Sequence, residues 1–216
     1  MIKYTFFFLF FFFSLVLPVL ALPIDTTFTV YKDGEFTTQC QRRVKSSNKV
    51  TSEVTEYLVT DFHNSPGHLF DWALKDLGLQ EKKNNELIIV FKSSNHDLKT
   101  GITHGVFDIE VPNITSFKNI KVDAIVAKTK YLNGTGKVTA DIAYSTMLLD
   151  KAYGYITVIP QKNNEQLYVT NFKIKFGWFF NIFITQNRYK KIVEWRVRKF
   201  TDNMKFESEE RQKNDK

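Results

Sequence analysis

The last segment of the chain, residues 173–216, constrains the fold more than any other part of the sequence. Apolar and polar residues alternate up to Phe176, Gly177 follows, and the chain then runs to its end without another Gly or Pro. A period of two predicts a strand, and a single glycine permits a corner after it. We therefore expect a strand, a corner at Gly177, and one long helix that starts near Trp178 and frays beyond Glu210.

The spacing of the apolar residues favours a helix over a strand after the glycine. Residues 193–198 alternate on their own, but over a longer window the apolar side chains recur at intervals of four, four, three and four residues, which is helical spacing. A helix with a wide apolar face must pack on other elements, and the preceding strands are the only large candidate, so we expect a curved sheet that holds the helix. The stripe consists of Tyr189, Val193, Val197, Phe200 and Met204, widened by Ile192 and Trp195.

The first residues of the chain, 1–21, predict a signal peptide. Lys3 is the only charge before an apolar run over residues 6–17, and Pro18 and Ala21 follow at the positions of a helix break and a signal peptidase site. The apolar run is roughly a dozen residues long, short of the about 20 that span a bilayer, although an uncleaved membrane anchor is the alternative. We expect cleavage near Ala21 and export, into a periplasm or out of the cell.

The remaining residues, 22–216, are enough for one domain with a sizeable core. The whole chain carries 30 basic and 23 acidic side chains, so the exported domain has a moderate positive charge. Cys40 is the single cysteine, so no intramolecular disulfide is available to hold the fold. We expect Cys40 to be a small buried side chain, and a reactive or intermolecular thiol is the alternative.

Residues 26–45 predict a pair of strands joined at Asp33 and Gly34, a dipeptide typical of tight hairpin turns. Residues 50–62 have apolar side chains at helical spacing but many β-branched ones, and a helix is the favoured interpretation. Residues 66–77 predict a second short helix, because Pro66 suits a first helical position.

From residue 86 onward the sequence predicts about six strands joined by short turns, hence an antiparallel meander and an α+β fold class. Apolar residues run together or alternate with polar ones over residues 87–91, 107–111, 122–126, 138–144, 153–159 and 167–176.

The strand that ends Lys-Phe-Gly-Trp-Phe and the helix that reads Asn-Arg-Tyr-Lys-Lys-Ile-Val-Glu-Trp resemble the C-terminal end of START-like domains. That superfamily, SRPBCC, includes polyketide cyclases and lipid-transport proteins. The resemblance implies a helix-grip fold: a curved antiparallel sheet of about six to seven strands on a long C-terminal helix, with two short helices near the N-terminus. It covers residues 36–212, and the strand at residues 26–31 is a departure.

Members of this superfamily commonly hold a hydrophobic ligand between the sheet and the long helix. Together with the predicted signal peptide, the resemblance leads us to expect an exported protein that binds an apolar or amphipathic, lipid-like molecule. We expect it to be a monomer without a cofactor. Aromatic and aliphatic residues on strands and helix are the candidate walls of the cavity. They are Phe107, Ile109, Tyr144, Tyr155, Phe172, Ile174, Trp178, Val193, Trp195 and Val197.

An enzyme of the cyclase or hydrolase type that uses the same cavity is the first alternative. It requires a titratable group such as His104, Asp141 or Tyr153 in the cavity. The sequence contains no motif of a known nucleophile or phosphate-binding loop, so no catalytic residue is assigned. The four histidines lack metal-ligand spacing, and no metal site is predicted.

The second alternative is an envelope protein that uses the basic residues of the C-terminal helix for its interactions. Such a face could contact an anionic membrane surface, although an ordinary solvated helix face is the simpler interpretation. The export signal argues against nucleic acid as a partner. The apolar residues 176–184 predict core packing rather than a wedge into a bilayer. The six cations are Arg188, Lys190, Lys191, Arg196, Arg198 and Lys199.

Overall fold

The computed structural model describes residues 25–65, 88–111, 115–132, 134–146, 148–182 and 184–215. The predicted signal peptide and the predicted helix over residues 66–77 lie outside these ranges. Within them, no helix is both long and apolar enough to cross a lipid bilayer. The elements are β1 (Thr27–Lys32), β2 (Glu35–Val44), α1 (Asn48–Asn64), β3 (Ile88–Asp97), β4 (Ile102–Val111), β5 (Thr115–Lys130), β6 (Gly136–Ser145), β7 (Leu149–Pro160), β8 (Gln166–Phe176), α3 (Trp178–Asn181), α4 (Gln186–Tyr189), η1 (Lys190–Glu194) and α5 (Trp195–Asn214).

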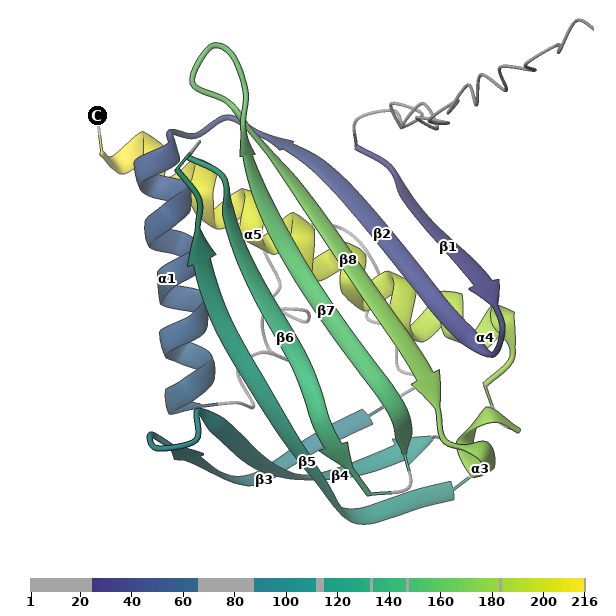
Figure 1. Cartoon of the computed structure of the whole chain (residues 1–216). Helices are drawn as coiled ribbons and strands as arrows, with labels where there is room; N and C mark the ends of the chain where they lie inside the picture. The colour runs from purple at the N-terminus through teal and green to yellow at the C-terminus, as the bar shows by residue number, and fades with distance from the viewer. Residues whose placement is uncertain are drawn as a thin grey trace, which may run out of the picture.

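The eight strands form one antiparallel sheet in the order β1-β2-β8-β7-β6-β5-β4-β3. The predicted hairpin is confirmed: Asp33 and Gly34 both have positive φ, 54° and 79°, as a tight turn between twisted strands requires. The predicted meander is also confirmed, over β3 to β8. Figure 1 shows that the sheet is curved, that α5 crosses behind β2, β8 and β7, and that β3 and β4 lie across the lower end of the view. This is the α+β helix-grip architecture, with β1 as the additional strand.

Helix α1 confirms the helical interpretation of residues 50–62. Ser47 caps the helix, since its Oγ accepts a hydrogen bond from the backbone N–H of Val50 at 3.3 Å. Five of the six β-branched residues of α1 lie on the buried face and only Thr60 is exposed; the hydroxyls of Thr51 and Thr55 donate to backbone carbonyls one turn earlier. Burial against the sheet therefore outweighs the weak preference of these residues for strands.

The C-terminal segment departs from the expectation of one helix that starts near Trp178. The short helix α3 ends at Asn181, and a new helix begins at Gln186, where the hydroxyl of Thr185 accepts the N–H of Arg188 at 3.2 Å. The chain then passes through the π-helical turn η1 into α5, which extends to Asn214 rather than fraying beyond Glu210. The side chain of Thr185 is a capping signal that apolar periodicity alone does not detect.

The core lies between the helices and the inner face of the sheet. We define the inner face as the face that α1 and α5 cover, and the outer face as the opposite one. Among the described elements, α5 packs chiefly on β2 and β8, and α1 packs on β5 and β6. One cluster of buried residues joins α1, α5 and the middle of the sheet. A second cluster joins α3, α4 and the ends of β2, β7 and β8.

Candidate ligand-binding site

Much of the inner face of the sheet is apolar. The register pairs Phe36 with Ile174, and Ile174 with Ala152, across β2, β8 and β7. Further along, it pairs Phe107 with Ile120 across β4 and β5. All of these side chains are buried. The inner face therefore carries buried apolar side chains on strands from β2 to β4, with the buried hydroxyls of Thr38 and Thr170 among them.

Six of the ten predicted wall residues belong to this inner region. Phe107 and Ile109 lie on β4 and are each 6% exposed. Phe172 and Ile174 lie on β8, and Val193 packs with them in the second core cluster. Val197 of α5 is buried under the sheet as well. The structure thus brings together residues from β8 and the helix, and places a second apolar group on β4.

The other four predicted wall residues are not on the inner face. Tyr144 follows a β-bulge: it pairs with Asp123, whereas Ile142 pairs with the adjacent Ala124, so one extra residue turns Tyr144 outward. Its side chain is 52% exposed. Strict alternation from Ile142 would have placed Tyr144 on the inner face, and the sequence carries no sign of the bulge.

Tyr155 also lies on the outer face, beside Tyr153 and under the ammonium group of Lys137, which is 4.3 Å from the ring centroid. Trp178 is 80% exposed at the start of α3. Trp195 lies on the side of the helix that faces β1 and lines a pocket at that edge of the sheet. Tyr155 and Trp178 therefore do not contribute to the surface between the sheet and α5, and Trp195 lies only at its β1 edge.

The titratable groups suggested for an enzyme face away from the interior. His104 pairs with Asp123 on the outer face, with Nδ1 and Oδ1 2.8 Å apart. Asp141 and Tyr153 are paired with each other on the same face. The structure therefore does not place any of these three suggested groups in the interior.

Two histidines meet in a way that their distance in sequence does not reveal. The rings of His63 and His96 stack with centroids 4.1 Å apart. His63 Nε2 bonds to the carbonyl of Val126, and His96 Nδ1 bonds to Thr103 Oγ1. Burial and the neighbouring His63 lower the pKa of His96. In the described ranges, no three His, Cys, Asp or Glu residues gather as metal ligands would.

The contact between β2, β8 and the helix contains buried polar groups that sequence reasoning missed. The hydroxyl of Tyr189 lies 2.8 Å from Thr38 Oγ1, and the hydroxyl of Thr201 lies 2.9 Å from Thr170 Oγ1. The ring of Tyr189 also stacks on Phe36, with centroids 4.0 Å apart. Threonines at alternate strand positions could have indicated such pairs, but only with knowledge of which helix residues face them.

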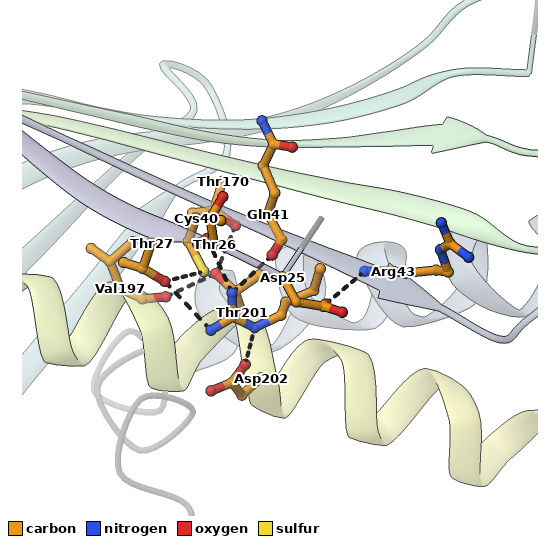
Figure 2. Close-up of polar contacts among 11 residues, drawn as sticks. Asp25, Thr26, Thr27, Cys40, Gln41, Arg43, Thr170, Val197, Thr201 and Asp202 are labelled. Atoms are coloured by element: carbon orange, nitrogen blue, oxygen red, sulfur yellow. Dashed lines mark hydrogen bonds and ion pairs between the residues drawn. The ribbon is translucent and has the colours of Figure 1, made fainter. Parts of the chain in front are cut away.

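Figure 2 shows the polar cluster around Cys40, at the contact of β1, β2 and α5. The hydroxyl of Thr27 donates to Cys40 Sγ at 3.2 Å. Beside it, Arg42 Nε donates to Asp202 Oδ1 at 2.6 Å. The Cys40 side chain is buried, as predicted, and burial raises the pKa of its thiol. A buried, protonated thiol is a poor nucleophile, so this cluster is structural.

Comparison with solved structures finds the following proteins, all of low sequence identity to this chain. A START superfamily protein from Mycobacterium smegmatis is 11% identical, with 83% of this chain and 99% of that chain covered, at a TM-score of 0.42. Norcoclaurine synthase from Thalictrum flavum is 12% identical, with 81% and 96% covered, at a TM-score of 0.39. The di-domain ARO/CYC StfQ from the steffimycin biosynthetic pathway is 10% identical, with 82% and 52% covered, at 0.45.

No family model matches the sequence, and no curated protein matches it either. The TM-scores of the solved structures are below 0.5. The fold assignment therefore rests on this chain's own element order and sheet topology. At the level of the fold, the resemblance to START-like domains is confirmed.

Proposed function

We propose that this protein binds an apolar or amphipathic small molecule between the inner face of the sheet and helix α5. The observation that carries the proposal is the extent of the apolar inner face. Among the described elements, α5 packs chiefly on β2 and β8, and α1 packs on β5 and β6. The inner face continues beyond these contacts onto β4, where Phe107 and Ile109 are apolar and turned inward.

Apolar contacts are sufficient to hold such a ligand. Burial of apolar surface contributes about 25 cal/mol per Å², so a lipid-like chain along the inner face binds without any charged partner. Phe107, Ile109, Phe172, Ile174, Val193 and Val197 are the residues assigned to the walls. A lipid is the ligand class that this lining favours.

A fluorescent probe without charge tests the proposal. N-phenyl-1-naphthylamine brightens in apolar sites, and fatty acids should displace it from the protein. The variant Val122→Trp places an indole on the inner face of β5, opposite Gly105. We expect it to weaken probe binding at least about tenfold, roughly 1.4 kcal/mol. Ile125→Trp is the matched control, because Ile125 lies on the outer face of the same strand and is already exposed.

Equal probe binding by the two tryptophan variants would refute the site, provided that both keep the circular dichroism spectrum of the native protein. Mass spectrometry of protein purified without detergent is the second measurement. We expect a co-purified lipid-like molecule, whose signal Val122→Trp lowers and Ile125→Trp leaves unchanged.

The proposal also covers the export of the protein, its oligomeric state and its contact with a membrane surface. We propose that residues 1–21 are removed and that the domain acts as a monomer outside the cytoplasm. N-terminal sequencing of the secreted protein tests the first point, and an N-terminus upstream of residue 18 would contradict it. Peripheral contact with an anionic membrane surface is part of the proposal, supported by the exposed cations Lys190 and Lys191 and by the exposed apolar side chains of Trp178 and Ile182.

A further inference from the structure

An open pocket of about 600 Å³ lies at the β1 edge of the sheet, apart from the apolar inner face on β4. One wall comes from the N-terminal strands and the other from the helical segment between Lys190 and Arg198. The pocket lies within the size range of about 300 to 1,000 Å³ that is usual for small-molecule sites. It is lined by Asp25, Thr27, Arg42, Lys190, Lys191, Glu194, Trp195 and Arg198.

The charge of this pocket is positive. Four of the lining side chains are cationic and two are carboxylates. Each carboxylate already accepts a hydrogen bond from a strand: Asp25 Oδ1 from the backbone N–H of Arg43 at 3.2 Å, and Glu194 from the hydroxyl of Thr29. Lys190 is exposed and has no carboxylate within 4.0 Å among the described residues. The pocket therefore attracts anions.

Arg42 forms a fixed part of the wall. Its side chain is 11% exposed and its guanidinium is held on three sides. Nε donates to Asp202 at 2.6 Å, one terminal nitrogen donates to the carbonyls of Thr26 and Gln41, and the other lies 3.4 Å from Thr27 Oγ1. The Asp202 carboxylate balances the charge of Arg42, so Arg42 serves as a rigid wall, and the positive excess of the pocket comes from Lys190, Lys191 and Arg198.

The helical wall contains the π-helical turn η1, over Lys190–Glu194. Such turns are rare and are found frequently at functional sites. The six cations of the helix, which look like one charged face in the sequence, separate here. Lys190, Lys191 and Arg198 reach the pocket, whereas Lys199 is buried, and burial lowers the pKa of Arg196. Three of the six cations of the helical segment therefore line the pocket.

We propose that this pocket binds a small molecule that carries a phosphate or a similar oxyanion group and a flat apolar part. Lys190, Lys191 and Arg198 supply charge-assisted donors to the oxyanion, as such groups commonly do for phosphates. The indole of Trp195 supplies a flat surface for the apolar part. The site is independent of the apolar ligand proposed for the interior. Its phosphate group comes from a soluble phosphate ester or from a lipid headgroup.

Calorimetric titration with phenyl phosphate tests the site, because this probe carries both features. We expect saturable binding that weakens at least about tenfold in the double variant Lys190→Gln, Lys191→Gln, through the loss of two charged donors. The double variant Lys173→Gln, Lys175→Gln is the matched control, since it removes two exposed lysines of β8 outside the pocket. Trp195→Leu should weaken binding of phenyl phosphate and leave binding of inorganic phosphate unchanged.

The outcomes separate the alternatives. Equal loss of affinity in both lysine double variants would show a general charge effect and would overturn the site, as would the absence of saturable binding to the native protein. Co-sedimentation with phosphatidylcholine vesicles that contain phosphatidic acid identifies the source of the phosphate. The pocket binds a lipid headgroup if vesicle binding depends on Lys190 and Lys191 and is displaced by phenyl phosphate. It binds a soluble ester if the protein binds phenyl phosphate but not the vesicles.

The two proposals fail independently. The neutral naphthylamine probe does not need the lysines of the pocket, so its binding should be unchanged in Lys190→Gln, Lys191→Gln. Phenyl phosphate binding should likewise be unchanged in Val122→Trp, the variant that blocks the inner face. A variant that abolishes both signals would indicate unfolding or a single shared site, and a shared site would overturn the assignment of this pocket as a separate one.

Discussion

A chain of hydrogen bonds links the helical segment at residues 189–194 to the first two strands. It predicts that the effect of Tyr189→Phe on the free energy of unfolding changes sign when Thr38 is replaced. Glu194 accepts a hydrogen bond from the hydroxyl of Thr29, whose single proton is thereby used. Thr29 Oγ1 must therefore accept from Thr38, at 2.9 Å, and Thr38 Oγ1 must accept from Tyr189, at 2.8 Å. The carboxylate at one end thus sets the direction of every bond up to the buried phenol.

The perturbation is Thr38→Val, which keeps the shape of the side chain and opens no cavity. Thr38 and Tyr189 are fully buried. The variant leaves the Tyr189 hydroxyl without an acceptor, which costs about 1 to 3 kcal/mol for a buried donor. Tyr189→Phe alone removes one hydrogen bond and costs about 1 kcal/mol. The aromatic ring at position 189 still stacks on Phe36 in both variants.

The decisive comparison is Tyr189→Phe in the two backgrounds. In the native chain this mutation should destabilise the protein by about 1 kcal/mol. In the Thr38→Val background it should stabilise the protein by a similar amount, because it removes a buried hydroxyl that has no acceptor. Equilibrium unfolding in urea, followed by circular dichroism, measures all four free energies of unfolding. Additive effects of the two mutations would refute the direction of the hydrogen-bond chain.

Three further predictions concern buried polar groups. Burial raises the pKa values of Tyr168 and Tyr189, so above about pH 10 the folded state retains protons that the unfolded state loses. The free energy of unfolding should therefore fall as the pH rises above about 10, and replacing either tyrosine with Phe should reduce this fall. Urea titrations at several pH values measure it. Asp202→Asn should destabilise the protein by about 1 to 2 kcal/mol, because it removes the partner of the mostly buried Arg42, and an unchanged urea midpoint would contradict this. The Cys40 thiol should react with a disulfide reagent only in unfolded protein, and rapid labelling of the native state at pH 8 would contradict its burial.

Local patterns in the sequence were sufficient for the order of the elements. The dipeptide Asp33-Gly34 indicated the hairpin, because few residues accept positive φ at two successive positions. Alternation indicated the strands, and the spacing of apolar residues indicated a long C-terminal helix. The helix over α1 was correct despite its β-branched residues, because their apolar spacing agrees with the face that the sheet buries.

The candidate site was predictable only in part. Phe107, Ile109, Phe172 and Ile174 are on the inner face because no irregularity intervenes within their own strands to turn them outward. Tyr144 is on the outer face because a bulge inserts one residue before it, and a shift of one residue reverses the direction of every side chain that follows. A bulge depends on the pairing of two strands, so neither strand shows it alone.

By itself, then, the sequence determined the secondary structure, the antiparallel meander and the closing helix, because turn conformations and apolar periodicity act over a few neighbouring residues. Tertiary structure alone decided which aromatic residues face inward and which three of six cations line the pocket beside Trp195. These outcomes depend on strand register and on the packing of distant segments. A charge or a ring becomes part of a site only when another element of the fold is placed opposite it.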